Sequence, residues 1–529
     1  MAPLTSWNLL AFAAISVTRI HAAPAPEPKV VAFPLERKSV PLSDVLYTRR
    51  LNKRAAQAYT ATLYNAQDHS LYLINATIGT PGQPFQLQLD TGSSDIWAPW
   101  VDSNICKDTP SRCSTGSFND VDSSSFTEVA PDKFYISYVD GTQITGDYVN
   151  ETFSVAGVTI TDMTMGIAKD MTGAPGGDDA PFTGLVGVGF DTNEAIFSQS
   201  NGQIMYPTIM SQLVNEGKIA TRAFSLWLND ITASSGSILF GGVDSAKYSG
   251  DLVMLPIQTD PVSGIKSSYT VTLAGVTVTG AGGKTVYSGK SSAPCLLDSG
   301  NSRAFVPADI GWDILAGVGA VNDTDIGTFI VPCDVGSTQG SFTFQFGNSN
   351  GPTVSVPISE FVLPLEGVTF KNGQSACQWA LLPDDGNGAT LGDTFLRSAY
   401  VVYDLDGMEI GMAQTKFNVT DSSVKEITAA GSIPGASSTA SGDATVPTNT
   451  PTATVPIVTG TTDIALNSNT NTFALGSPTA SASSSSGSAS ASKGAAPGLS
   501  PPSTPFVGTV VAGIAVLFAM LGGSMFILV

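Results

Sequence analysis

Two short acidic motifs repeat within this chain of 529 residues, and the repeat is the strongest constraint on its fold. DTGSS begins at Asp90 and DSGNS begins at Asp298, and each follows an apolar run, LQL or CLL. An element ending in glycine, LVG or TLG, comes later at nearly the same interval: Gly187 lies 97 residues after Asp90, and Gly392 lies 94 residues after Asp298. Equal internal spacing indicates a duplicated unit.

The duplication predicts two similar lobes related by a pseudo-twofold axis, with the two aspartates facing each other across a cleft. Apolar residues alternate with period two in PFQLQLD and AYVVYDLDGMEIGMA, and frequent turn residues interrupt such runs, which predicts a mostly β structure. Apolar spacing of three and four predicts short helices at 207–216 and 307–318. We expect the lobes to span residues 55–245 and 246–418.

Histidine is scarce, and this restricts the chemistry available to an enzyme of this sequence. The two histidines are His21 and His69, so a Ser-His-Asp or Cys-His relay would depend on His69, and an HExxH zinc site is excluded. No CxxC pair occurs, and we expect neither a metal nor a cofactor. Carboxylates are therefore the expected general acid and base. The excess of 44 acidic over 24 basic residues, a net charge of −20, argues against a nucleic-acid partner.

The first 54 residues have the pattern of segments that are removed. Residues 1–23 contain a short apolar run followed by small residues, which is typical of a secretory signal peptide; a buried core segment is the alternative. Residues 24–54 are basic and end in Lys53-Arg54, a dibasic site of the kind that kexin-type proteases cut. We expect a propeptide that docks on the acidic body and is released by acidification, and a mature chain that begins at Ala55. The alternative is a linker whose basic residues only mark it for cleavage.

The C-terminal part of the chain changes composition twice. Residues 419–505 are rich in Ser, Thr, Ala, Pro and Gly, so we expect a disordered, O-glycosylated stalk and spacer without a packed core. The uncharged apolar run 506–529 then ends the chain. Small residues from Gly494 onward, a spacer and this tail match a GPI-attachment signal, which predicts attachment at Gly494 and removal of the tail. A retained tail-anchor helix is the alternative.

Residues 72–414 carry a series of ordered motifs around the two aspartates: YLINATIGTPGQPFQLQLDTGSSDIWAP, ISYVDGTQITG, FTGLVGVGF, LLDSGNS and LGDTFLRSAYVVYDLD. Together they resemble the pepsin-like aspartic proteases, and in particular the fungal yapsin and candidapepsin-like members. The resemblance implies a bilobal fold and hydrolysis of peptide bonds by Asp90 and Asp298. Two carboxyl groups in contact share one proton, so the ionised one can activate a water while the protonated one donates to the scissile carbonyl.

The resemblance also implies roles for the residues beside the two aspartates. Gly92 and Gly300 lack a Cβ, so each loop can pack against the opposite lobe. Thr91 and Ser299 are expected to hydrogen-bond across the interface and to hold the two loops together.

The support expected for the two carboxyl groups is unequal. Ser93 is expected to support the Asp90 carboxylate. Asn301 stands where the family has Thr or Ser, so the hydroxyl expected to support Asp298 is missing. An amide can also donate a hydrogen bond, so we expect an altered pKa of the pair and reduced activity rather than loss of function.

A flap over the substrate is implied by ISYVDGTQITG. Tyr138 is expected on a mobile hairpin with Trp97 as its packing and hydrogen-bonding partner; plain core packing is the alternative. Val139 replaces a common glycine and is expected to stiffen the hairpin. In fungal relatives an acidic residue at the position of Asp140 favours Lys or Arg before the cut bond, whereas the alternative is a solvated turn formed by Asp140 and Gly141.

The cysteines and sequons fit a secreted glycoprotein. By resemblance, Cys106 pairs with Cys113 and Cys333 with Cys377, which leaves Cys295 as a buried, inert thiol. The N-glycosylation sequons begin at Asn75, Asn150, Asn322 and Asn418.

Two functions from different classes remain open at this point. The first is an acid-active aspartic endopeptidase, monomeric and tethered by a GPI lipid to the plasma membrane or by glycans to the cell wall, with peptides and proteins as substrates. The second is a weakly active or silent protease-like protein of the cell wall, which Asn301, Val139 and the long stalk would suit. Retention of both aspartates and of Tyr138 favours the endopeptidase.

Overall fold

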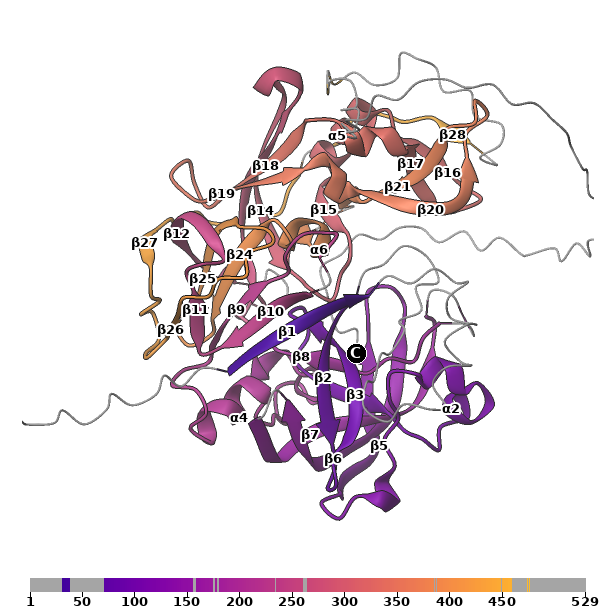
Figure 1. Cartoon of the computed structure of the whole chain (residues 1–529), viewed down its shortest axis with the longest axis vertical. Helices are drawn as coiled ribbons and strands as arrows, with labels where there is room; N and C mark the ends of the chain where they lie inside the picture. The colour runs from indigo at the N-terminus through magenta and orange to yellow at the C-terminus, as the bar shows by residue number, and fades with distance from the viewer. Residues whose placement is uncertain are drawn as a thin grey trace, which may run out of the picture.

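The computed structural model of the protein is mostly β and has two lobes, built from the two halves of the sequence (Figure 1). It describes residues 31–38, 71–155, 158–174, 177, 180–233, 235–259, 264–384, 386, 388–448, 450–458, 473 and 475. The predicted signal peptide 1–23, Lys53-Arg54, Ala55, Gly494 and the tail 506–529 lie outside these residues. The predicted fold class is confirmed.

A sheet of fourteen strands runs through the N-terminal lobe and continues into the other lobe. In β3 the side chains of Phe85, Leu87 and Leu89 are buried in the main core, as their alternation predicts. The strands of this sheet in the N-terminal lobe are, in spatial order, β2 (Leu71–Ile78), β3 (Gln83–Asp90), β8 (Leu185–Gly187), β4 (Ile96–Pro99), β7 (Val158–Thr172), β6 (Gln143–Val155) and β5 (Thr127–Ser137).

The C-terminal lobe repeats the arrangement around β3. There β14 pairs in parallel with β23, which pairs antiparallel with β15, just as β3 pairs in parallel with β8, which pairs antiparallel with β4. The predicted duplication is therefore present in the strand pairing. One sheet of this lobe contains β19 (Thr353–Pro357), β18 (Ser341–Phe346), β13 (Thr270–Thr279), β14 (Thr285–Leu297), β23 (Ala389–Leu391), β15 (Ala304–Pro307) and β22 (Leu381–Asp384). A second contains β20 (Val362–Thr369), β21 (Ser375–Trp379), β17 (Thr328–Pro332), β16 (Val321–Asp323) and β28 (Ile457–Val458).

Strands from both halves of the sequence lie between the two lobes and join them (Figure 1). An aromatic cluster packs on them: the ring of Tyr403 lies 4.6 Å from the rings of both Phe224 and Tyr269. The joining strands are β12 (Tyr248–Pro256), β25 (Glu409–Thr415), β24 (Ala399–Asp404), β9 (Ala223–Trp227) and β10 (Ser235–Phe240). Backbone pairing continues from β10 to β2 through β1 (Val31–Lys38), and the buried aromatic contacts add to it in holding the lobes in one orientation.

The α-helices of the described residues have four to eleven residues each. The two predicted helices are present as α4 (Ile209–Asn215) and α5 (Ala308–Val318), and α5 ends at Gly319, whose φ of 74° suits glycine. The remaining α-helices are α2 (Asn104–Asp108), α3 (Ala195–Gln199) and α6 (Asp393–Leu396). Within the ranges given above, no helix is long and apolar enough to cross a membrane.

Part of the predicted propeptide 24–54 is built into the sheet. Strand β1 (Val31–Lys38) pairs antiparallel with β10 on one side and with β2 on the other. The docking expected from charge therefore has a backbone component, because strand pairing joins this segment to both halves of the sheet.

The prediction of a disordered stalk from residue 419 is wrong for its first part. Residues 419–448 and 450–458, here called the C-terminal strap, pack on the body of the protein. Strand β26 (Val424–Glu426) pairs with β11 (Gly242–Asp244), β27 (Ala436–Thr439) pairs with β12, and β28 pairs with β16. Pairing of this kind uses backbone groups, so a composition poor in large apolar side chains does not prevent it.

A few apolar side chains fix the strap to the body. Ile427 is fully buried, and Ile433 and Ala440 are nearly so. Further along, Phe473 and Leu475 are also buried, and the backbone N–H of Phe473 donates to the carbonyl of Gly317 over 3.0 Å. The C-terminal lobe therefore extends well beyond the boundary expected at residue 418.

A chain that ends at Asn418 should be less stable than one that ends at Leu475. It lacks Ile427 and Ile433, each worth about 1.5–3 kcal/mol when buried, less the entropy of ordering the strap. It also leaves the edges of β11, β12 and β16 without partners. We expect a melting temperature lower by several degrees and more aggregation, measured by calorimetry and light scattering. Equal melting of the two chains would show that the strap contributes nothing.

Candidate active site

The two repeated motifs meet where the lobes join. Asp90 ends β3, Asp298 follows β14 directly, and both side chains are buried, at 3% and 8% exposure. A Cβ on Gly92 would lie 2.5 Å from Oδ1 of Asp298, and a Cβ on Gly300 would collide with Oδ1 of Asp90. Each loop therefore approaches the carboxyl group of the opposite lobe at a glycine, as expected.

Hydroxyl groups lock the two loops together across the lobe interface. Oγ1 of Thr91 donates to the carbonyl of Leu297 over 2.9 Å, and Oγ of Ser299 donates to the carbonyl of Leu89 over 3.1 Å. Each hydroxyl also accepts the backbone N–H of the other residue, over 2.9 Å and 3.2 Å. The four bonds obey the pseudo-twofold symmetry and fix the separation of the two carboxyl groups.

The two carboxyl groups are hydrogen-bonded to each other but have unequal surroundings. Asp90 also accepts hydrogen bonds from the Ser93 hydroxyl and, over 2.7 Å, from the backbone N–H of Gly92. Asp298 accepts the backbone N–H of Gly300 over 2.8 Å. Burial raises the pKa of both carboxyl groups, and the negative charge of Asp90 raises the pKa of Asp298 further. The pKa of Asp298 is therefore raised further than that of Asp90, which favours Asp298 as the holder of a shared proton and Asp90 as the ionised partner.

The side chain of Asn301 forms a different hydrogen bond from the one expected with Asp298. Its side-chain oxygen accepts the backbone N–H of Arg303 over 3.0 Å, which closes a turn within its own loop. Among the hydrogen bonds of the described residues, none runs from the Asn301 amide to Asp298. The second carboxyl group therefore lacks a counterpart to the Ser93 hydroxyl.

Tyr138 lies in the turn of the hairpin that joins β5 and β6, here called the flap. Its hydroxyl accepts a hydrogen bond from Nε1 of Trp97 over 2.8 Å, as expected. Burial raises the pKa of Tyr138 well above its usual range, and the charge of Asp90 adds to the effect. Tyr138 is therefore a neutral hydroxyl close to Asp90.

The tip of the flap is a tight turn rather than a loose loop. Oδ1 of Asp140 accepts the backbone N–H of Thr142 over 2.8 Å, and Gly141 has a φ of 90°. The side chains of Val139 and Asp140 are exposed. Strand β7 pairs with β6 as far as Gln143, so a third strand supports the flap almost to its tip.

Behind the flap lies a pair of buried acids that the sequence motifs did not reveal. Asp95 accepts the backbone N–H of Ala195 over 2.8 Å and the hydroxyl of Tyr206 over 2.7 Å. Glu194 is fully buried and accepts the backbone N–H of Tyr206 over 3.0 Å. Burial, with a further contribution from Asp95, raises the pKa of Glu194 to about 10, so this group is neutral at physiological pH. Asp95 stands five residues after Asp90, but its partners come from residues a hundred positions away.

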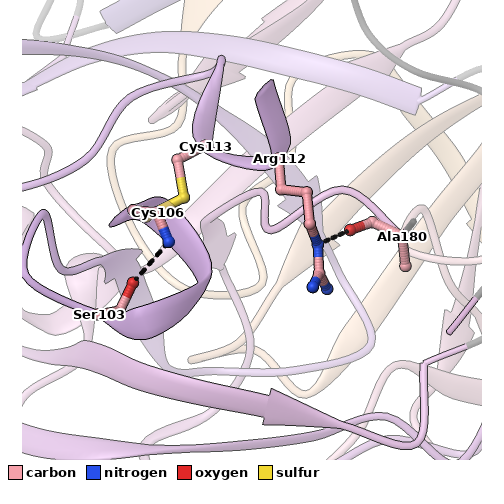
Figure 2. Close-up of a disulfide and its surroundings, with 5 residues drawn as sticks. All are labelled: Ser103, Cys106, Arg112, Cys113 and Ala180. Carbon is pink, nitrogen blue, oxygen red and sulfur yellow. Dashed lines mark hydrogen bonds between the residues drawn. A yellow bond between two sulfur atoms is a disulfide. The ribbon is translucent and has the colours of Figure 1, made fainter. Parts of the chain in front are cut away.

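Both disulfides implied by the resemblance are present. The disulfide between Cys106 and Cys113 joins α2 to the turn that follows it (Figure 2). Beside it, Nε of Arg112 donates to the carbonyl of Ala180 over 2.6 Å. The other disulfide joins Cys333 and Cys377. Cys295 is a free, buried cysteine, and burial raises the pKa of its thiol, which makes it a poor nucleophile.

The sequons lie on the body of the protein. Asn75 and Asn418 have exposed side chains, whereas those of Asn150 and Asn322 are half-buried. Oδ1 of Asn75 accepts a hydrogen bond from Gln86, and Oδ1 of Asn150 accepts one from Thr164.

Comparison with known proteins identifies the class. Residues 71–415 match the eukaryotic aspartyl protease family, which covers both lobes and both aspartates. The chain belongs to this family of pepsin-like aspartic endopeptidases.

The relatives it resembles are fungal proteases. It is 38% identical over 413 residues to the probable aspartic-type endopeptidase opsB of Aspergillus oryzae, which covers 77% of this chain and 81% of that protein. It is 37% identical over 375 residues to an acid protease of Saccharomycopsis fibuligera, covering 70% of this chain and 87% of that protein. Candidapepsin-1 of Candida albicans is 35% identical over 379 residues, with the same coverage.

Replacing Asn301 by threonine should move the alkaline limb of the pH–activity profile. A hydroxyl at this position would stabilise ionised Asp298 and lower its pKa, so the protonated, active form would be lost at lower pH. One hydrogen bond to a carboxylate corresponds to a shift of about one pH unit. Ser93→Ala is the matched variant: it raises the pKa of Asp90 and should move the acid limb upward. Profiles of kcat/KM against pH that coincide with the wild type would contradict this account.

Proposed function

We propose that the protein is a secreted, acid-active aspartic endopeptidase in which Asp90 and Asp298 perform the chemistry. The observation that carries the proposal is the hydrogen-bonded pair of buried carboxyl groups, one from each lobe. Asp90 accepts a side-chain hydrogen bond from Ser93, and Asp298 has no matching donor at Asn301. Ionised Asp90 accepts a proton from a water, which attacks the peptide carbonyl carbon, while Asp298 donates its proton to the carbonyl oxygen. Tyr138 encloses the substrate from above.

An acidic working range is proposed from the protonation of Asp298 and Glu194, one acid in each lobe. The pair needs its one proton, which Asp298 holds until the pH rises through its pKa. Glu194 acts in the same direction: its folded pKa of about 10 exceeds its ordinary value of 4.5. Its contribution to stability is therefore complete below about pH 4.5 and declines as the pH rises toward 10.

The exposed carboxyl group of Asp140 at the tip of the flap is the basis for proposing a preference for Lys or Arg before the cut bond. Only one oxygen of Asp140 is used by the turn, through the N–H of Thr142, and the side chain is exposed at the tip beside Gly141. An ionised carboxylate there can pair with a substrate cation. The turn thus orients the group without neutralising its charge.

The cellular setting is proposed from the two ends of the chain and from the relatives. Relatives include a protein named secreted aspartic protease 1 of Candida albicans. Removal of 1–23, cleavage after Lys53-Arg54 and GPI attachment at Gly494 would deliver a monomer to the outer leaflet of the plasma membrane or to cell-wall glycans. Glycans at Asn75, Asn150, Asn322 and Asn418 fit the same route.

A weakly active or silent protease-like protein is the second candidate. The missing donor from Asn301 to Asp298 and the exposed Val139 favour it. The intact cross-lobe bonds of Thr91 and Ser299, and the placement of Tyr138, favour the enzyme.

Asp90→Asn and Asp298→Asn should each abolish cleavage of a quenched fluorescent peptide at acidic pH. Asp90→Asn removes the general base, and Asp298→Asn removes the group that holds the shared proton. We expect each change to lower kcat by at least about a thousandfold. A statine-type inhibitor should block the wild type. Cleavage that survives both substitutions, or a wild type without activity on any peptide of a diverse library, would favour the silent protein.

Asp140→Asn should reduce the preference for basic residues while leaving cleavage of neutral sequences intact. Loss of one exposed ion pair predicts a fall of about threefold to tenfold in kcat/KM for Lys or Arg before the cut bond. Asp170→Asn is a control of equal charge on an exposed strand position nearby. Digestion of a peptide library by the wild type without enrichment of Lys or Arg would refute the preference.

A further inference from the structure

A side chain outside the two motifs crosses the lobe interface and contacts the second catalytic loop. Nε2 of Gln88 donates a hydrogen bond to the carbonyl oxygen of Gly300 over 3.1 Å. Gln88 lies on β3 two residues before Asp90, and because side chains alternate along a strand, both lie on the same face. One strand thus presents a carboxyl group and an amide to the opposite lobe.

Gln88 binds the second loop at Gly300, the residue whose N–H donates to Asp298. The carboxyl group of Asp298 has fewer hydrogen-bond donors than that of Asp90. Asp90 is held by the Ser93 hydroxyl and by the N–H of Gly92, whereas Asp298 is held by the N–H of Gly300. Asn301 is engaged with Arg303 in its own loop. The orientation of the Gly300 N–H therefore depends on what fixes the backbone of Gly300, and Gln88 holds the carbonyl of that residue.

The first loop has a comparable bond. Nδ2 of Asn193 donates to the carbonyl of Gly92 over 3.3 Å. Each catalytic glycine thus has its carbonyl held by a side-chain amide, and both amides belong to the N-terminal lobe. The one that reaches across the interface is Gln88.

We propose that Gln88 is a positioning residue that acts through Gly300, holding the second loop so that its N–H stays aligned on Asp298 in place of the hydroxyl that Asn301 does not supply. This rests on the proposed function, since it assigns a role relative to the pair Asp90 and Asp298. The other titratable groups that face Asp298 are Asp393 at the start of α6 and Tyr403 of β24.

Gln88→Leu and Gln88→Glu separate hydrogen-bond donation from packing. Gln88→Leu removes the donor at every pH, so kcat should fall about fivefold to tenfold with little change in KM, because the lost alignment matters in the transition state. The carboxyl group introduced by Gln88→Glu can donate while it is protonated and cannot once ionised. That variant should keep most of the wild-type kcat at low pH and lose it at a lower pH than the wild type does.

Gln86→Leu is the matched control, because Gln86 lies on the same face of β3 and bonds to Asn75 within its own lobe. Its kcat profile should follow the wild type. Melting temperatures of all variants identify loss of folding, and if Gln88→Leu does not fold, the pH dependence of Gln88→Glu decides.

The outcomes separate this inference from the proposed function. A wild type that cleaves, with Gln88→Leu and Gln88→Glu matching its kcat at every pH, overturns the role of Gln88 and leaves the function intact. Equal losses in Gln86→Leu and Gln88→Leu also overturn it, since they would report a general effect on β3. A wild type as inactive as Asp90→Asn overturns the function and the inference with it.

Discussion

The contact between one carboxyl group from each lobe is the constraint on which the rest of the structure depends. Two buried acids can touch only if they share a proton and if nothing bulky intervenes, hence a glycine two residues after each aspartate. The hydroxyls of Thr91 and Ser299 set their separation, and the strands between the lobes maintain the orientation in which that separation is useful. A displacement of either lobe would break the contact.

Within this symmetric frame, the two loops give their aspartates different hydrogen-bond partners, and the division of roles proposed for Asp90 and Asp298 depends on that difference. The Ser93 hydroxyl favours a charge on Asp90, and the lack of a matching donor on the other side favours a neutral Asp298. An exact twofold arrangement would leave the proton equally shared. The duplicated ancestry of the lobes is therefore seen in the backbone, while the chemistry arises where their side chains differ.

The fold and the centre of the site could be predicted from sequence because both depend on local, repeated patterns. Asp90, Asp298 and the helix α5 stand in such patterns, whereas the cysteine pairs are implied by the family resemblance. The partners of Gln88 and Glu194 could not, since their contacts join residues brought together by tertiary folding. The error at the strap has a different origin: composition reports the side chains available for a core, whereas strap residues dock largely through backbone pairing with strand edges.

The docked strap and the buried Leu475 beyond it reduce how far the protease can reach from its proposed attachment at Gly494. Counted from Asn418, a fully extended chain would span about 260 Å, but counted from the buried Leu475 it spans only about 65 Å. Attachment at Gly494 would therefore confine the lobes to a layer a few nanometres deep. An enzyme held in this way would meet proteins that enter the layer or are embedded in it, and its effective concentration toward neighbours on the same surface would be correspondingly high.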